Sequence, residues 1–355
     1  TKITGGANVT KKNIVKDSKK ILVTGSSGFV GSWLSIALHK MGASVYGISL
    51  KPNTSPSLFK ILGLENKIKQ KYIDICKFKA LNSAIKEISP DIIFHLAAQP
   101  LVIESYKRTI DTFNTNVIGT LNVLESCKNL GTNANFICIT TDKCYENNEF
   151  GERFVESDPM GGKDPYSASK ACTEILTKSY ALSFNSLKLC TARAGNIIGG
   201  GDWAKDRIVT DIVESIKNKR DIILRSPKAI RPWQHVIDVV NGYLKLAIYN
   251  ADKKDIFDSF NFGPQEENEI DVETLTNKFI SNWNSCDSNI VIDNNKNLPE
   301  SKILRLDSSK ANHILDWKPL MDIDTTIKET AVWYENFYVN KNIYEFTIEQ
   351  INKYL

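Results

Sequence analysis

The chain has 355 residues, of which 42% are hydrophobic and 24% charged, as in an ordinary globular protein of one large or two modest domains. Its net charge of +4 is too small to indicate a nucleic-acid partner, and no apolar stretch is long enough to predict a membrane span. The seven cysteines include no Cys-x-x-Cys pair and the four histidines show no metal-ligand spacing, so we expect a reduced, cytoplasmic protein without a bound metal.

Composition and periodicity divide the chain into three segments. Residues 1–19 are polar and lack the apolar segment of a secretory signal, so we expect a disordered tail. Strand and helix patterns alternate over residues 20–194, which predicts an α/β fold with a Rossmann-like, doubly wound parallel sheet. Shorter elements fill residues 195–355, which we expect to form mainly a smaller substrate-binding lobe, with some chain returning to the first domain.

The predicted strands of the first domain are 20–24, 44–49, 70–73, 91–95, 134–140 and 187–193. Its predicted helices are 29–41, 77–88, 109–130 and 166–183. In the lobe, the patterns predict helices over 205–217 and 236–249 and a strand over 222–224.

A glycine-rich loop lies between the first predicted strand and the first predicted helix. Gly25, Gly28 and Gly31 are spaced as in a dinucleotide-binding turn, with Phe29 and Val30 opening the helix. Glycines permit a tight turn and a close backbone approach to a pyrophosphate, which then lies at the helix N-terminus. The GxxGxxG spacing resembles that of the extended short-chain dehydrogenase/reductase superfamily.

The second predicted strand does not end in the acid that usually binds the ribose of NAD. Lys51 follows it instead, and a basic residue at this place could accept the 2′-phosphate of NADP. The residues alone therefore leave NAD and NADP open. Asp74, after the third strand, is either an acceptor for the adenine amine or a helix N-cap.

Polar residues follow the strand predicted over 134–140. In open α/β sheets, ligands bind at the carboxyl ends of the strands, so Thr141, Asp142 and Lys143 are expected to face the substrate. Thr141 can hydrogen-bond a reacting oxygen, and the acid and amine beside it are two proton carriers. This pair favours removal of a proton from carbon together with loss of water from the neighbouring carbon.

Tyr166 and Lys170 are four residues apart in the helix predicted over 166–183, so they share one face. We expect the ammonium of Lys170 to lower the pKa of the Tyr166 phenol and to hydrogen-bond the nicotinamide ribose. Tyr166 can then take the proton of a substrate hydroxyl while hydride leaves the same carbon for the cofactor.

Beyond these motifs, the chain from about Lys20 to Leu355 resembles the CDP-glucose 4,6-dehydratases. The stretches that carry the resemblance are Phe94–Val102, Thr115–Thr120, Thr140–Asn147, Met160–Gly162, Asp164–Ser167, Ala192–Ala204 and Arg231–Val236. The related dTDP-glucose dehydratases have Asp-Glu where this chain has Asp142-Lys143, so Lys143 points to the cytidine branch.

The resemblance implies an NAD-dependent lyase that converts CDP-glucose to CDP-4-keto-6-deoxyglucose and water. It implies oxidation at C4 through Tyr166 and Lys170, with Thr141 at the reacting oxygen, and control of the C5 proton and C6 hydroxyl by Asp142 and Lys143. The implied cofactor-binding residues are Gly25, Gly28, Phe29, Val30, Gly31, Asp74, Ile75, Ala97, Ala98, Gln99, Tyr166 and Lys170. The implied substrate-binding residues are Asn196, Trp203, Asp206, Arg207, Arg231 and His235.

Other interpretations stay open at this point. Trp203 could be a core aromatic residue, and Arg207 a solvated helix residue. A nucleotide-sugar 4-epimerase or reductase would use the same scaffold but needs no second proton carrier. A catalytically silent NAD-binding regulatory protein would be expected to lack Tyr166 or Lys170. We expect a CDP-sugar substrate and, from the apolar faces of the helices over 109–130 and 166–183, a homodimer or homotetramer.

Overall fold

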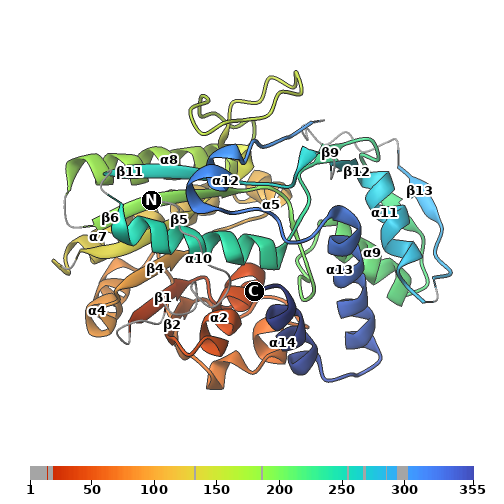
Figure 1. Ribbon diagram of the computed structural model, residues 1–355, viewed down its shortest axis with the longest axis horizontal. Coiled ribbons are helices and arrows are strands. Elements are labelled where there is room, and N and C mark those ends of the chain that lie inside the picture. Colours follow the sequence, from red (N-terminus) through yellow and green to blue (C-terminus); the bar gives the residue numbers. More distant parts are fainter. Residues whose placement is uncertain are drawn as a thin grey trace.

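The computed structural model describes residue 14 and residues 19–355, except 132, 185–186, 254–255, 267–268, 285 and 294–302. In this part of the chain, seven parallel strands form one sheet in the order β11-β6-β5-β4-β1-β2-β3 (Figure 1). Helices cover both faces of the sheet, which confirms the predicted doubly wound α/β fold. The sheet strands are β1 Lys20–Thr24, β2 Ser44–Ser49, β3 Lys69–Tyr72, β4 Ile92–His95, β5 Ala134–Ile139, β6 Leu187–Ala194 and β11 Phe257–Phe262.

Alternate residues of the inner strands enter two separate hydrophobic cores, as the two-residue period of a strand requires. Ile21 and Val23 of β1 join the core that contains α2 and α10, whereas Leu22 joins the core that contains α4 and α7. The helices around the sheet are α2 Phe29–Lys40, α3 Leu58–Ile61, α4 Phe78–Ile88, α5 Val102–Lys107, α6 Thr109–Phe113, α7 Gly119–Lys128, α8 Pro165–Ser183 and α10 Val236–Asp252. Short helical turns are η2 Leu64–Asn66, η3 Asn114–Ile118 and η4 Asp142–Cys144.

The helix predicted over 109–130 is helical from Thr109 to Lys128, but its middle is not α-helical. A π-helical turn, η3, separates α6 from α7. Within this turn, the Asn116 amide donates to Ser169 Oγ at 2.8 Å and to the Gln99 carbonyl at 3.1 Å, and its oxygen accepts from the Gln99 amide at 2.8 Å. The wider turn thus aims one side chain at α8 and at the loop after β4, and π-turns commonly occur near functional sites.

The lobe lies beside the sheet at the right of Figure 1 and uses small strand pairs. β8 pairs with β13 in parallel, and β9 pairs with β12 in antiparallel orientation. The chain returns to the sheet through α10 and β11, because β11 pairs with β6 at the sheet edge. The remaining elements are β7 Ile197–Ile198, α9 Ile208–Lys217, β8 Ile222–Leu224, β9 Ile230–Arg231, β10 Gln234–His235, β12 Ile270–Asp271, α11 Val272–Ser281, β13 Ile290–Ile292, α12 Ser309–Leu315, α13 Ile323–Tyr338 and α14 Ile343–Tyr354.

The disordered tail expected over residues 1–19 lies outside the described residues, apart from Ile14 and Lys19. Ile14 is buried in the core that contains α2 and α10, which differs from the expectation for that position. No helix in the described part of the chain has both the length and the hydropathy needed to cross a bilayer.

Candidate active site

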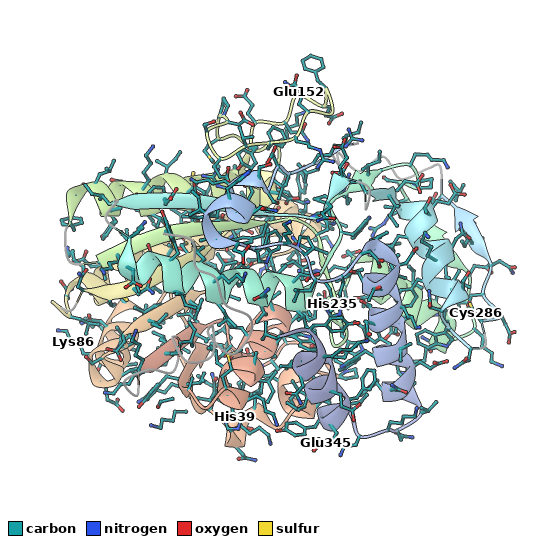
Figure 2. All side chains as sticks on the ribbon, viewed as in Figure 1. His39, Lys86, Glu152, His235, Cys286 and Glu345 are labelled. Atoms are coloured by element: carbon teal, nitrogen blue, oxygen red, sulfur yellow. The ribbon has the colours of Figure 1, made fainter. Side chains whose placement is uncertain are left out.

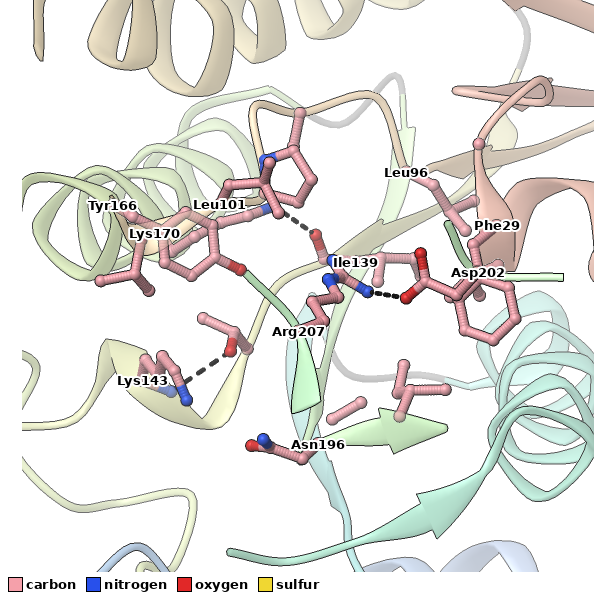
Figure 3. Close-up of a pocket in the computed structure, with 18 of the residues that line it drawn as sticks. Phe29, Leu96, Leu101, Ile139, Lys143, Tyr166, Lys170, Asn196, Asp202 and Arg207 are labelled. Carbon is pink, nitrogen blue, oxygen red and sulfur yellow. Dashed lines mark hydrogen bonds and ion pairs between the residues drawn. The ribbon is translucent and has the colours of Figure 1, made fainter. Parts of the chain in front are cut away.

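A cleft of about 850 Å³ opens at the carboxyl ends of the sheet strands, between the sheet and the lobe. Residues from the glycine loop, from the end of β5, from the start of α8 and from the lobe line its walls. Figure 3 shows Tyr166, Lys143, Arg207 and Asn196 around this space. The cleft therefore lies where ligands bind in open α/β folds.

The glycine loop forms one end of the cleft. Gly25 has a φ of 74°, and its amide donates to the Ile48 carbonyl at 2.8 Å. A Cβ on Gly31 would lie 2.1 Å from the Gly25 carbonyl oxygen, so only glycine lets α2 start this close to the turn. Phe29 and Val30, in the first turn of α2, line the cleft. Backbone N–H groups at a helix N-terminus have no partner within the helix, which suits a pyrophosphate.

The predicted adenine and ribose region continues from this loop. Asp74, Ile75, Ala97 and Ala98 all line the cleft. Asp74 Oδ1 accepts from the Cys76 amide at 2.9 Å in a turn before α4, and Lys77, not Asp74, is the N-cap of that helix. The glycine loop and the residues that follow β3 and β4 thus fit a dinucleotide.

Tyr166 lies in the first turn of α8, which begins at Pro165 and is capped by Asp164. Both Tyr166 and Lys170 are buried, and Lys170 Nζ donates to the Ile139 carbonyl at 3.0 Å. Burial lowers the pKa of Lys170.

We expect from the sequence that Lys170 lowers the pKa of Tyr166, but the net shift of this pKa is upward. Burial raises the pKa of Tyr166, because a buried phenolate loses its hydration. A hydrogen bond with Thr141 and the charge of Arg207 lower the pKa, whereas the charge of Asp142 raises it further. The phenol is therefore protonated unless groups around it favour the phenolate.

Thr141, Asp142 and Lys143 form a short turn directly after β5. Thr141 Oγ1 accepts from the Lys143 amide at 3.3 Å and donates to Asp142 Oδ1 at 2.9 Å. Asp142 is buried, and its Oδ2 has no hydrogen-bond partner among the described residues. Burial raises the pKa of this carboxyl, while Lys143 and Thr141 lower it. Lys143 Nζ lies 4.0 Å from Asp142 Oδ1 and is the more exposed of the two.

Lobe residues complete the cleft opposite this turn. Asn196, Asp206, Arg207 and Arg231 line it. Arg207 Nη1 lies 2.7 Å from Asp202 Oδ2, an ion pair drawn as a dashed line in Figure 3. The Arg231 charge acts on Asp142 and the Arg207 charge on Tyr166, so both cations lie close to the predicted proton carriers.

Three predicted binding residues do not line the cleft. Trp203 packs against Trp333 with a ring separation of 5.8 Å, so it is a core aromatic residue. His235 is buried, and its Nδ1 accepts from the Ile237 amide at 3.2 Å as the N-cap of α10. Figure 2 labels His235 inside the molecule, near α13.

Gln99 is the third of these residues. Its side-chain amide donates to the Leu101 carbonyl and to Thr112 Oγ1, and its oxygen accepts from the Leu101 amide at 2.6 Å. The side chain thus shapes the loop after β4. We leave Gln99, Trp203 and His235 out of the proposed binding residues, since none of them lines the cleft.

The comparisons with known proteins agree with this geometry. The family model described as GDP-mannose 4,6 dehydratase matches residues 22–330. The CDP-glucose 4,6-dehydratase of Salmonella typhimurium is 40% identical over 347 residues, which are 95% of this chain and 96% of that protein. The chain belongs to the GDP-mannose 4,6 dehydratase family.

Solved structures of lower identity share the fold. The UDP-glucose 4-epimerase of Stenotrophomonas maltophila, determined with bound NAD, superposes with a TM-score of 0.81 at 19% identity and covers 90% of this chain and 99% of that chain. The dTDP-glucose 4,6-dehydratase of Bacillus anthracis in complex with NAD gives a TM-score of 0.75 at 22% identity, with coverage of 91% and 98%.

The cleft also contains residues that the sequence analysis missed. Asp211, Ile223 and Arg225 line the lobe side of the cleft. The sequence contained a signal for Arg225, because a polar residue directly after a predicted strand, here the strand over 222–224, is a candidate ligand-binding residue. The same signal led to Thr141. Asp211 lies in the first turn of α9, where an acid is common for reasons of helix stability alone.

A buried ion pair near the turn at 141–143 was also missed. Arg193 Nη2 lies 2.9 Å from Glu174 Oε2, and Arg193 Nη1 donates to the Tyr145 hydroxyl at 2.8 Å. Glu174 also accepts from Thr140 and Thr191. Thr140 and Tyr145 flank the turn at 141–143, whereas Arg193 and Thr191 belong to β6 and Glu174 to α8. The network therefore fixes this turn relative to Tyr166 and Lys170.

Proposed function

We propose that the chain is an NAD-dependent hydro-lyase that converts CDP-glucose to CDP-4-keto-6-deoxyglucose and water. The observation that carries this proposal is the buried carboxyl of Asp142 beside the amine of Lys143, in one cleft with Tyr166 and Lys170. An alcohol dehydrogenation needs the tyrosine alone, whereas elimination of water also needs an acid and a base.

The cofactor site is proposed on the residues that line the cleft. Gly25, Gly28 and Gly31 with the first turn of α2 would hold the pyrophosphate, and Asp74 and Ile75 would flank the adenine. When bound, NAD supplies a hydride acceptor at C4 that becomes the hydride donor at C6 in the same turnover. NAD is favoured over NADP despite Lys51, because the family resemblance points to NAD.

The first step concerns the C4 hydroxyl. Tyr166 takes the proton of this hydroxyl. Thr141 hydrogen-bonds Tyr166, and Lys170 lies one helical turn after Tyr166 in α8. Thr141 and Arg207 favour the phenolate, and the charge of Asp142 opposes it. A protonated Asp142 removes that opposition, so the raised pKa of Asp142 also helps Tyr166 to ionise.

The second step removes water across C5 and C6. The C4 ketone acidifies the neighbouring C5–H, and Lys143 accepts this proton as the neutral amine. Asp142, whose pKa is raised by burial, gives a proton to the departing C6 hydroxyl. The C–H bond at C5 and the C–O bond at C6 break, a C5–C6 double bond forms, and one water leaves. Hydride would then add at C6, and the ammonium of Lys143 would return its proton to C5, which gives the 4-keto-6-deoxy product.

The alternatives are weaker on the same observations. A 4-epimerase or reductase reaction needs no proton carrier besides Tyr166, so it gives no role to the buried Asp142 or to its neighbour Lys143. A silent NAD-binding protein would not need Tyr166 and Lys170 in the cleft, where both lie. The epimerase structures above share the fold, and at 19% identity they indicate nothing further about the reaction.

The nucleotide, the assembly and the compartment belong to the same proposal. A CDP-sugar is favoured by Lys143, the residue at which the dTDP-glucose dehydratases differ. A homodimer or a dimer of dimers is supported by the outward apolar side chains of α6, η3 and α8, among them Ile110, Ile118 and Ile175. The free thiols of all seven cysteines support a cytoplasmic setting.

The experiment is an incubation of purified protein with CDP-glucose, without added cofactor, followed by base. We expect the absorbance of a 4-keto sugar, and NAD as the nucleotide released on denaturation and identified by mass spectrometry. A 4-epimer of the substrate with no keto product would favour the epimerase, and NADP as the main nucleotide would overturn the cofactor proposal.

A further inference from the structure

The lobe end of the cleft carries a mixed-charge cluster that the proposed chemical steps do not use. Arg225, directly after β8, lies between two carboxylates: its Nη1 is 3.5 Å from Asp206 Oδ1 and its Nη2 is 3.4 Å from Asp211 Oδ2. Ile223 lines the same end of the cleft and is 52% exposed, although it is a large apolar residue.

The cations of this cluster are not the ones that act on the proton carriers. Arg207 acts on Tyr166 and Arg231 on Asp142, whereas the charges that act on Asp211 are those of Arg225 and Asp206. If the hexose lies at Tyr166, as the proposed function requires, the diphosphate meets the two nearer arginines. The nucleobase then reaches the cluster. The apolar side chain of Ile223 offers the base a surface for its ring face.

The carboxylate of Asp211 has an oxygen available for a ligand. Its Oδ2 faces Arg225, and among the described residues its Oδ1 receives no hydrogen bond. Burial and the charge of Asp206 raise the pKa of Asp211 to about 6, while Arg225 lowers it. The group is therefore mainly ionised at neutral pH and acts only as an acceptor.

We propose that Asp211 recognises cytosine by accepting a hydrogen bond from its 4-amino group. Carboxylates are the natural partners of this amine. Uracil and thymine carry a carbonyl oxygen at the same position, and an ionised carboxylate repels it. This inference rests on the proposed function for the orientation of the substrate, and it assigns the choice among pyrimidine nucleotides to one residue.

The decisive variant is Asp211→Asn, because an amide can present either its oxygen to cytosine or its nitrogen to uracil. Calorimetry with CDP and with UDP measures binding to the full chain without turnover. We expect the wild type to bind CDP roughly 10- to 100-fold more tightly than UDP. In the variant, UDP binding should strengthen until the two affinities lie within about threefold. An unchanged preference for CDP would overturn the proposal.

A matched control is Asp287→Asn, which removes an exposed lobe carboxylate that lies 4.0 Å from Lys219 Nζ. It should keep the wild-type preference. Turnover of CDP-glucose and UDP-glucose separates the two proposals. Dehydration of CDP-glucose with an unchanged base preference in Asp211→Asn would sink this inference alone. A base preference that depends on Asp211, with no dehydration of either sugar nucleotide, would sink the proposed function alone.

Discussion

At the residue scale, replacement of Tyr166 tests the first proton transfer, because it can remove a single oxygen atom. The change to Phe keeps the ring in its buried site and removes only the hydroxyl. We expect kcat to fall by about 10²- to 10⁴-fold, because the C4 proton has no acceptor, while CDP binds as in the wild type. Calorimetry and the keto-sugar assay measure the two quantities. Turnover near the wild-type rate would remove Tyr166 from the mechanism.

Lys143 tests the elimination. In Lys143→Ala, oxidation at C4 should proceed and the reaction should stop there, because no base takes the C5 proton. The absorbance of reduced nicotinamide should therefore rise on mixing with CDP-glucose, and C5 should take up no solvent deuterium. Lys219→Ala, which removes an exposed lysine outside the cleft, is the control. Normal dehydration with deuterium at C5 would show that another residue is the base.

At the scale of one element, α10 contains a carboxyl that makes stability depend on pH. Asp238 is buried near the start of this helix, Oδ1 accepts from the Leu320 amide at 2.5 Å, and Oδ2 has no partner among the described residues. Burial raises the pKa of Asp238 from 3.8 to about 7. The folded state thus holds a proton that the unfolded state releases, so the contribution is present at low pH and is lost as pH rises toward 7.

The corresponding variant is Asp238→Asn, which keeps an acceptor for Leu320 and cannot ionise. Its free energy of unfolding, relative to the wild type, should increase by about 1.4 kcal/mol per pH unit from pH 4 to 7 and then level off. Urea denaturation at four pH values measures this difference. A difference that stays constant with pH would show that Asp238 does not titrate between the folded and unfolded states.

At the scale of the whole molecule, the face formed by α6, η3 and α8 predicts assembly. Ile110, Ile118 and Ile175 are exposed on these neighbouring elements. Light scattering at micromolar concentration should give a multiple of the 39.9 kDa chain mass. Charged residues at Ile110 and Ile175 together should shift the mass toward one chain, and a wild-type monomer would contradict the prediction.

Local patterns predicted the sheet and many of the residues that line the cleft, because strand periodicity, glycine spacing and polar residues at strand ends are encoded by neighbouring residues. The π-turn at η3 was missed because it depends on Asn116 meeting Ser169, which is remote in sequence. Trp203, for which a core position stayed open, and His235 are buried away from the cleft, since residue type does not distinguish a ligand contact from a core contact. The pKa of Tyr166 depends on burial, which only the folded molecule sets.

The order of the strands also has a consequence for synthesis on the ribosome. The edge strand β11 is made after α9 and α10, although it pairs with β6 along the whole of its length. Until residue 262 has emerged, β6 has an open edge of unpaired backbone groups, which is a template for association with other nascent chains. Chaperone dependence of a growing chain should therefore end abruptly once β11 is available, well before the C-terminal helices are complete.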